Sequence, residues 1–148
     1  MRRALLQASY GLKEDEVPVG AVIVYKEKII AQAYNQIERL KDPTAHAEMI
    51  AITQAASFLK SKWLTGCALY VTIEPCSMCA GALVLSRIDK VIFGASDPKT
   101  GAFGSKLDIN KLRLNHKITV KKGVLEQDCA RILQQFFQTK RNQNHSRN

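Results

Sequence analysis

The sequence has no long apolar run and only four cysteines, which argues against a membrane protein and against a disulfide-rich protein. No stretch approaches the roughly 20 consecutive apolar residues that span a bilayer, which argues against a membrane protein. Basic residues open the chain, but charged residues at 13–16 come before any long apolar run, so we expect no signal peptide and a cytoplasmic location. Without secretory features, the four cysteines favour metal or redox chemistry over two disulfides.

The sequence also lacks internal repeats and any stretch of linker composition. Its 148 residues fit one domain, which at this size buries about 70% of the surface that its unfolded chain exposes. We therefore expect a single domain over residues 1–138. The uniformly polar residues 139–148 are predicted to form a frayed tail.

Acidic residues are in the minority. The chain has 22 Lys and Arg against 13 Asp and Glu, which gives a net charge of +9. Such an excess favours a polyanionic partner, because lysine and arginine neutralise phosphates. Many basic proteins have no such partner, so charge alone leaves nucleic-acid binding open.

Hydrophobic periodicity predicts strands that alternate with helices. The first two strands are separated by residues 25–28 and form a hairpin, and Thr44 is predicted to cap the helix that follows the next loop, 35–43. The expected strands are 19–24, 29–34, 69–73, 90–94 and 118–120, and the expected helices are 3–13, 44–60, 75–87 and 128–137. Alternating elements of this kind predict a three-layer α/β fold.

The motif His46-Ala47-Glu48, followed by Cys76 and Cys79 in a C-x-x-C pair, carries the chemistry. Zinc binds imidazole and thiolate in tetrahedral geometry, and a catalytic site uses three protein ligands so that water takes the fourth position. Both halves of the motif lie at predicted helix starts, where the helix dipole favours thiolates. The sequence therefore predicts one catalytic zinc ion per chain, bound by His46, Cys76 and Cys79.

Glu48 lies two residues after the histidine ligand, close enough to reach a metal-bound water without binding the metal. Zinc lowers the pKa of a bound water to about 7 and so provides hydroxide at neutral pH. Glu48 is then the proton shuttle, which passes the proton to a ring nitrogen and later to the leaving amine. This is hydrolytic deamination at an amidine carbon.

Each half of the motif has a simpler explanation when it is taken alone. A lone H-x-E is usually a surface feature, and a lone C-x-x-C pair is redox-active or binds structural zinc, which needs four ligands. Cys67 and Cys129 are candidates for a fourth ligand, but their strand and helix contexts favour buried, inert thiols. His116 and His145 lie in polar segments and are expected to be solvated.

The combined motif is similar to the H-x-E and P-C-x-x-C signature of zinc deaminases. Nearly the whole chain resembles the bacterial tRNA-specific adenosine deaminases, which convert the wobble adenosine of an anticodon to inosine. The segments that carry this resemblance are residues 17–22 (VPVGAV), 42–48 (DPTAHAE), 70–76 (YVTIEPC), 78–82 (MCAGA) and 99–101 (KTG).

The resemblance implies the cytidine-deaminase-like fold, a three-layer α/β/α sandwich with a five-stranded mixed sheet. It also implies a homodimer that binds the tRNA anticodon stem-loop in a groove formed by both subunits. Asn35 stands where the family has an asparagine that hydrogen-bonds the target base, with a turn residue as the alternative explanation. The resemblance further places the Ala47 backbone N–H against the base, and it places Asp97, Lys99, Asn115 and His116 in loops near the RNA.

The C-terminal segment contains two adjacent phenylalanines that cannot both face one core. Phe136 continues the stripe of Ile132 and is expected in the core, whereas Phe137 is a candidate for stacking on RNA. Lys140 and Arg141 are expected to meet phosphate. Glu74 is a candidate for supporting the metal ligands, although it also suits a helix N-terminus without any such role.

Two other functions remain open from the sequence. The core motif also suits a deaminase of a free base or nucleotide, such as guanine, cytosine or dCMP, although the basic composition favours RNA. The second alternative is a non-catalytic subunit that binds RNA and is stabilised by zinc, and the intact Glu48 argues against it. We expect the enzyme to be a tRNA adenosine deaminase, a hydrolase acting on cyclic amidines.

Overall fold

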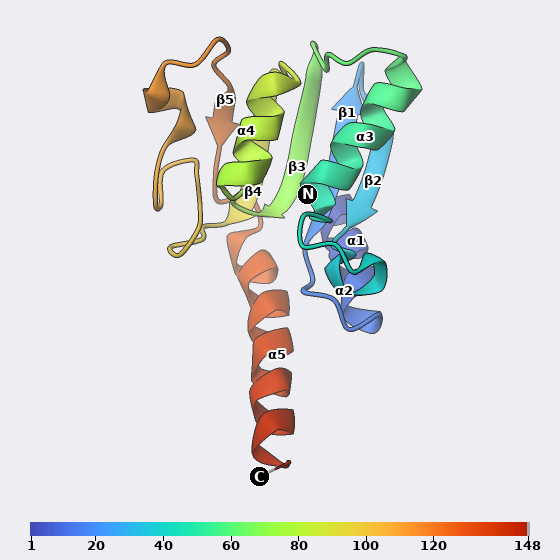
Figure 1. Ribbon diagram of the computed structural model, residues 1–148, viewed down its shortest axis with the longest axis vertical. Coiled ribbons are helices and arrows are strands. Elements are labelled where there is room, and N and C mark those ends of the chain that lie inside the picture. Colours follow the sequence, from blue (N-terminus) through green and yellow to red (C-terminus); the bar gives the residue numbers. More distant parts are fainter. Residues whose placement is uncertain (148) are drawn as a thin grey trace.

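Five strands form one mixed sheet in the order β2-β1-β3-β4-β5 in the computed structural model, which describes residues 1–147 (Figure 1). β1 is antiparallel to both β2 and β3, whereas β3, β4 and β5 are parallel. The strands are β1 (Gly20–Tyr25), β2 (Lys28–Tyr34), β3 (Cys67–Ile73), β4 (Lys90–Ala95) and β5 (Thr119–Lys121). The predicted five-stranded mixed sheet is confirmed.

Helices cover both faces of the sheet, which confirms the three-layer α/β/α sandwich. α3 (Ala47–Leu59) and α4 (Ser77–Leu85) lie on one face, and α1 (Arg2–Lys13) and α5 (Glu126–His145) lie on the other (Figure 1). Over residues 1–147, no helix combines the length and the apolarity needed to cross a bilayer.

Glycines allow the second helical layer to approach the sheet closely. A Cβ atom at Gly20 would collide with the backbone of Ala4 and Ala8 in α1. A Cβ atom at Gly94 would collide with Cys129 in α5. The opposite face of the sheet packs on the alanine stripe of α3, formed by Ala47, Ala51 and Ala55. Small residues on both faces thus hold the helices near the strands.

The predicted hairpin is confirmed, with Lys26 and Glu27 at its turn. Both residues have positive φ values, 47° and 64°, as in the tight turns that match the twist of antiparallel strands. The loop predicted over 35–43, in contrast, contains a short helix, α2 (Ile37–Leu40). The buried carboxylate of Glu16 accepts hydrogen bonds from the N–H groups of Glu38 and Arg39, which holds this single turn in place.

The starts of α3 and α4 differ from prediction. His46, not Thr44, is the N-cap of α3, and the Thr44 backbone N–H and hydroxyl both bond to Asp42 Oδ1 in a turn before the helix. α4 begins at Ser77 rather than at Pro75, because Pro75 and Cys76 pair with the chain at Gly101 and Ala102. Both metal-ligand candidates at these starts, His46 and Cys76, are consequently N-cap residues.

The C-terminal part of the chain is more regular than expected. A 3₁₀ helix, η1 (Ile109–Leu112), precedes β5, and α5 continues through His145 where a frayed tail was predicted from residue 139. The end of α5 projects beyond the rest of the molecule (Figure 1). Lys140 contributes to the extension, because its Nζ lies 2.6 Å from Asp15 Oδ2 and 5.6 Å from the centre of the Phe136 ring. Residue 148 lies outside the described residues, and a domain boundary at 138 stays a prediction.

Candidate active site

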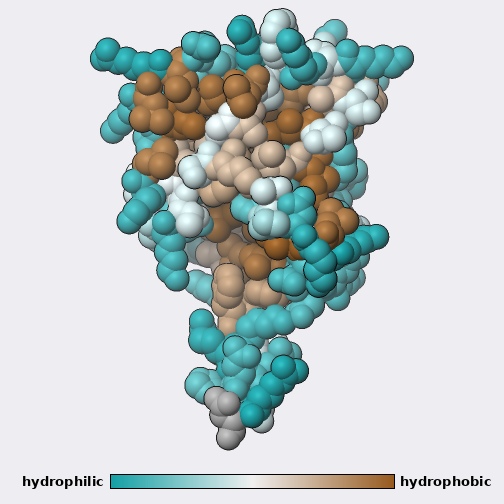
Figure 2. Space-filling model, viewed as in Figure 1, coloured by the Kyte–Doolittle hydropathy of each residue, from teal (hydrophilic) through white to brown (hydrophobic). Residues whose placement is uncertain are grey.

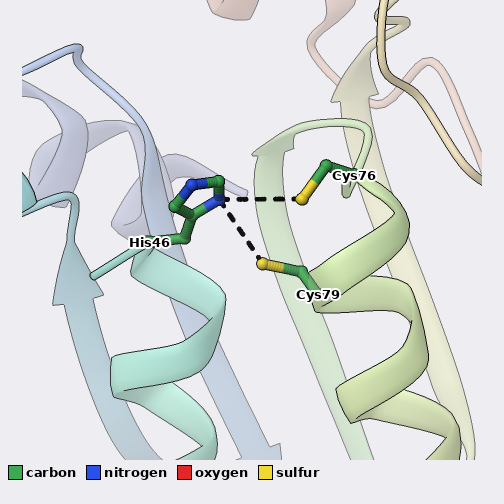
Figure 3. A group of neighbouring side chains, drawn as sticks. All are labelled: His46, Cys76 and Cys79. Carbon is green, nitrogen blue, oxygen red and sulfur yellow. Dashed lines mark hydrogen bonds between the residues drawn. The ribbon is translucent and has the colours of Figure 1, made fainter. Parts of the chain in front are cut away.

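His46, Cys76 and Cys79 come together at the end of the sheet where α3 and α4 begin (Figure 3). His46 Nδ1 lies 3.7 Å from Cys76 Sγ and 3.6 Å from Cys79 Sγ. Zn–N bonds of about 2.0 Å and Zn–S bonds of about 2.3 Å at a tetrahedral angle separate nitrogen from sulfur by about 3.5 Å. The donor set and its spacing therefore fit a zinc ion, as the sequence predicts.

Hydrogen bonding couples the pKa values of the two thiols of this cluster. A hydrogen bond from Cys79, together with the nearby His46, lowers the pKa of Cys76 to about 4. The same hydrogen bond and burial raise the pKa of Cys79. Hydrogen bonding to Cys76 also raises the pKa of His46. The lowered pKa of Cys76 favours its thiolate form, which is the form that binds metal ions.

Glu48 lies in the first turn of α3 and is only 3% exposed. Burial raises the pKa of its carboxyl group above the usual value. Its side chain lines the same cavity as His46 and Cys76. A carboxyl group in this environment is suited to exchanging protons with a molecule bound in that cavity.

A cavity of about 500 Å³ opens in front of the cluster. Its volume falls within the range of small-molecule sites, roughly 300–1,000 Å³. Strand ends, the loop after β4 and α5 all contribute to its walls. The lining residues are Val17, Val19, Asn35, His46, Glu48, Ile73, Glu74, Cys76, Ser96, Asp97, Pro98, Lys99, Thr100, Leu133 and Phe137.

Asn35 lies directly after β2, is 5% exposed and lines this cavity. Its Oδ1 accepts a hydrogen bond of 2.8 Å from the Ala47 N–H. This bond fixes the orientation of the amide and leaves Nδ2 available to a ligand. The Ala47 N–H, which the resemblance places against the target base, donates to Asn35 in this structure, and its contact with a base stays a prediction. Ala47 thereby orients the asparagine.

Glu74 organises the loop that follows β4. Its buried carboxylate accepts hydrogen bonds from the backbone N–H groups of Asp97, Phe103 and Ser105, and from the Ser105 hydroxyl. Gly101 lies so close to this carboxylate that a Cβ atom there would collide with it. Glu74 thus supports one wall of the cavity.

Asp97 and Lys99 belong to this loop and line the cavity, and their proximity to RNA stays a prediction. The Asp97 carboxylate, however, bonds within the loop, to the N–H groups of Lys99 and Thr100 and to the Thr100 hydroxyl. It therefore shapes the loop as a turn-forming side chain. Lys99 is exposed and carries the free charge of this wall.

The two phenylalanines of α5 separate as predicted. Phe136 is 8% exposed in the core, and Phe137 is 46% exposed and lines the cavity. Arg141 lies one helical turn further along and is exposed. Lys140, expected to meet phosphate, is paired with Asp15 instead.

The predicted loop residues Asn115 and His116 are not among the residues that line the cavity. Asn115 is exposed, and His116, expected to be solvated, is partly buried with its Nε2 2.6 Å from the Ile88 carbonyl oxygen. Cys67 and Cys129 are buried and unpaired, as predicted. Both lie outside the only metal-ligand cluster found in residues 1–147.

Sequence reasoning missed Leu133 and Val19, which line the cavity. Leu133 had a detectable signal, because it precedes Phe137 by four residues on α5 and shares its helix face. Glu16 was hidden in the charged run 13–16, although it is only 1% exposed. Nothing in its local sequence marks it as buried.

Comparisons with known proteins place this site in a family. The sequence model of the MafB19-like deaminases matches residues 1–141. The chain is 49% identical over 143 residues to the tRNA-specific adenosine deaminase of Aquifex aeolicus, covering 96% of this chain and 94% of that protein. It is 46% identical over 138 residues to the protein of the same name from Bacillus subtilis, covering 93% of this chain and 86% of that one.

A solved structure from work on A-to-I editing by tRNA:A34 deaminases at the wobble position of transfer RNA has the same fold. It superposes with a TM-score of 0.83 at 40% identity, covering 90% of this chain and 97% of that one. The chain therefore belongs to the MafB19-like deaminases and, among them, to the tRNA-specific adenosine deaminase family.

Proposed function

We propose that this protein deaminates adenosine to inosine at the wobble position of tRNA and that it binds one zinc ion per subunit. The observation that carries the proposal is the His46, Cys76 and Cys79 cluster, with zinc-compatible spacing, beside the buried Glu48 in a cavity of about 500 Å³. The names of the relatives supply the substrate. A tRNA substrate is consistent with the cytoplasmic location that the sequence predicts.

Glu48 does the proton transfers in this scheme. A zinc ion held by the three ligands supplies Lewis-acid activation of the attacking water at neutral pH. The Glu48 carboxylate accepts a proton from that water and delivers it to the purine ring nitrogen next to the reacting carbon. The oxygen of that water bonds to the reacting carbon, and Glu48 then carries the remaining proton of the added hydroxyl to the amino group. The C–N bond breaks, ammonia leaves, and the oxygen becomes the carbonyl of inosine. Burial favours the protonated carboxyl form that each delivery requires.

The remaining cavity residues orient the base. Asn35 presents Nδ2 as a donor to an acceptor on the base, because its Oδ1 is engaged by Ala47. Phe137 offers an exposed ring at the cavity rim, on which a neighbouring base can stack. Lys99 and Arg141 are exposed near the same rim and suit phosphate groups, since phosphate contacts position RNA while base contacts specify it.

The proposal is tested by incubating the zinc-loaded protein with an anticodon stem-loop that carries a wobble adenosine and measuring inosine. We expect conversion of that adenosine and none at adenosines in the double-stranded stem, because a paired base must leave the stack to enter the cavity. Free guanine, cytosine and dCMP serve as competing substrates. Turnover of one of these without any inosine in the RNA would overturn the tRNA assignment in favour of the free-base alternative.

We also propose that the protein works as a homodimer through the face formed by α4 and η1. Hydrophobic residues gather on this face (Figure 2). Leu85 at the end of α4 is 80% exposed, Leu112 is 60% exposed and Leu114 is 48% exposed. Exposed apolar patches of this kind on soluble proteins mark association surfaces. The family resemblance favours a second copy as the occupant.

Leu85→Lys is expected to convert the dimer to a monomer, because it places a charge on the most exposed leucine of the proposed apolar face. The side chain is exposed in the single subunit, so folding should be unaffected. Light scattering reports the mass, with the exposed Leu6→Lys in α1 as a control of the same chemical change. A wild-type protein that stays monomeric at micromolar concentration would refute the proposed dimer.

A further inference from the structure

The positive charge of this protein is concentrated at the end of the sheet opposite the cavity. That end, the distal end, is formed by the connections between β1 and β2, α3 and β3, α4 and β4, and η1 and β5 (Figure 1). Strand pairing brings these connections together, since Tyr25 pairs with both Lys28 and Cys67, and Lys90 pairs with both Ala68 and Thr119. β3 separates the distal end from the cavity by about 20 Å, the length of its seven residues.

Basic residues outnumber acidic ones strongly at the distal end. Its acidic residues are Glu27 and Asp89, which leaves an excess of seven positive charges out of the net +9 of the whole chain. All of its basic residues are exposed in the single subunit, and Figure 2 shows hydrophilic side chains along this upper margin. They are Lys26, Lys28, Lys60, Lys62, Arg87, Lys90, Lys111, Arg113 and Lys117. Lys111 and Arg113 border the proposed dimer face at η1, whereas the other seven lie on the connections beside it or on the strand ends.

These charges lack the compensation found elsewhere in the protein. Residues 1–147 contain four ion pairs, and none of them involves a distal basic residue. At the cavity end, by contrast, Arg39, Lys41 and Lys140 each pair with a carboxylate. The electrostatic attraction that the net charge predicts is therefore strongest away from the catalytic residues.

Aromatic rings hold part of the distal charge in place. Lys62 Nζ and Arg87 Cζ each lie 4.9 Å from the centre of the Trp63 ring, and Lys26 Nζ lies 5.2 Å from that of Tyr25. A ring attracts a cation without neutralising it, so the charge stays available to an anion. Exposed cations ordered beside aromatic rings are typical of surfaces that follow a nucleic-acid backbone.

We propose that the distal end is a second RNA-binding surface that engages the phosphate backbone of tRNA outside the loop whose base enters the cavity. The proposal rests on the tRNA substrate proposed above. Seven uncompensated charges suit a polyanion, and the substrate is the polyanion that this enzyme must hold. The surface lies about 20 Å from the cavity, so when the loop occupies the cavity the surface contacts parts of the tRNA outside that loop.

The test compares full-length tRNA with a minimal hairpin that carries the same loop and only a short stem. The distal variant is Lys60→Asn, Lys62→Gln and Arg87→Asn, since residues 60 and 87 have positive φ values that asparagine tolerates. The control variant is Arg2→Gln, Arg3→Gln and Lys13→Gln, which removes the same charge from α1. None of these residues lines the cavity.

We expect the distal variant to bind full-length tRNA about ten- to a hundredfold more weakly near physiological salt, with a salt slope lower by about two to three. Its affinity for the minimal hairpin and its turnover of that hairpin should match the wild type. The control variant should leave both affinities nearly unchanged, because isolated charges are screened beyond about 8 Å.

An unchanged affinity of the distal variant for full-length tRNA overturns the proposal. So does a loss of affinity that is the same for full-length tRNA and the minimal hairpin and the same in the distal and control variants. If the wild type binds vesicles of anionic phospholipid and only that binding is lost in the distal variant, the surface belongs to a membrane and the proposal is wrong. Failure of the proposed function is distinguishable, because the wild type would then deaminate neither RNA.

Discussion

Replacement of Glu48 by glutamine is expected to lower the rate of adenosine deamination by about two to four orders of magnitude, the usual contribution of a positioned acid and base. The amide keeps the size of the side chain at this 3% exposed position but neither accepts nor returns a proton at neutral pH. Zinc content should stay at one per chain, because the three ligand atoms lie on other residues. Single-turnover kinetics on the anticodon stem-loop and metal analysis of the same sample measure both quantities.

Glu27→Gln is the matched control, since the same chemical change occurs in an exposed turn at the distal end. It should leave turnover within about twofold of the wild type, as expected for a surface substitution. Parental activity in Glu48→Gln would refute the proton shuttle while leaving the zinc site intact. Loss of zinc from that variant would instead assign Glu48 to the metal.

Replacement of Cys79 by alanine is expected to remove both zinc and activity. Two ligands would remain, His46 and Cys76, which is one fewer than a catalytic zinc site uses. Zinc content should fall from one per chain to nearly none, and inosine formation should fall to background. Metal analysis after dialysis, with deamination measured on the same protein, checks the prediction.

Cys129→Ala provides the comparison, because Cys129 is a buried cysteine outside the cluster. It should keep a full complement of zinc and lose only stability, measured as the free energy of unfolding. Equal zinc content in the two variants would show that Cys79 is not a ligand. Removal of zinc from the wild type by a chelator, followed by its return, should abolish and restore activity without any substitution.

Local signals predicted most of the secondary structure. The hairpin of β1 and β2 followed from two β-branched, apolar runs around a short turn, which is a pattern within about 15 residues of chain. The exact starts of α3 and α4 did not follow. A turn in which Thr44 bonds to Asp42 precedes α3, and a distant segment sets the start of α4. Gly101 and Ala102 pair with Cys76 and Pro75, and this keeps Pro75 out of α4.

Short or isolated elements escaped prediction for a related reason. α2 has only four residues and depends on hydrogen bonds from Glu38 and Arg39 to the distant carboxylate of Glu16. The extension of α5 beyond residue 138 has no apolar period, and contacts of Lys140 with Asp15 and Phe136 accompany it. Composition around these segments indicates polar loops or tails, because the stabilising partners lie far away in the chain.

The sequence by itself determined the metal-ligand candidates and the proton shuttle. His46, Glu48, Cys76 and Cys79 lie in two short motifs at helix starts, and the chemistry of zinc and the geometry of one helical turn dictate their spacing. Only the tertiary structure decided that Ala47 orients Asn35, that Glu74 holds the loop beside the cavity, and that most of the net charge lies at the distal end. Each of these features joins segments that are separated by many residues, so packing of the sheet and not local pattern brings them together.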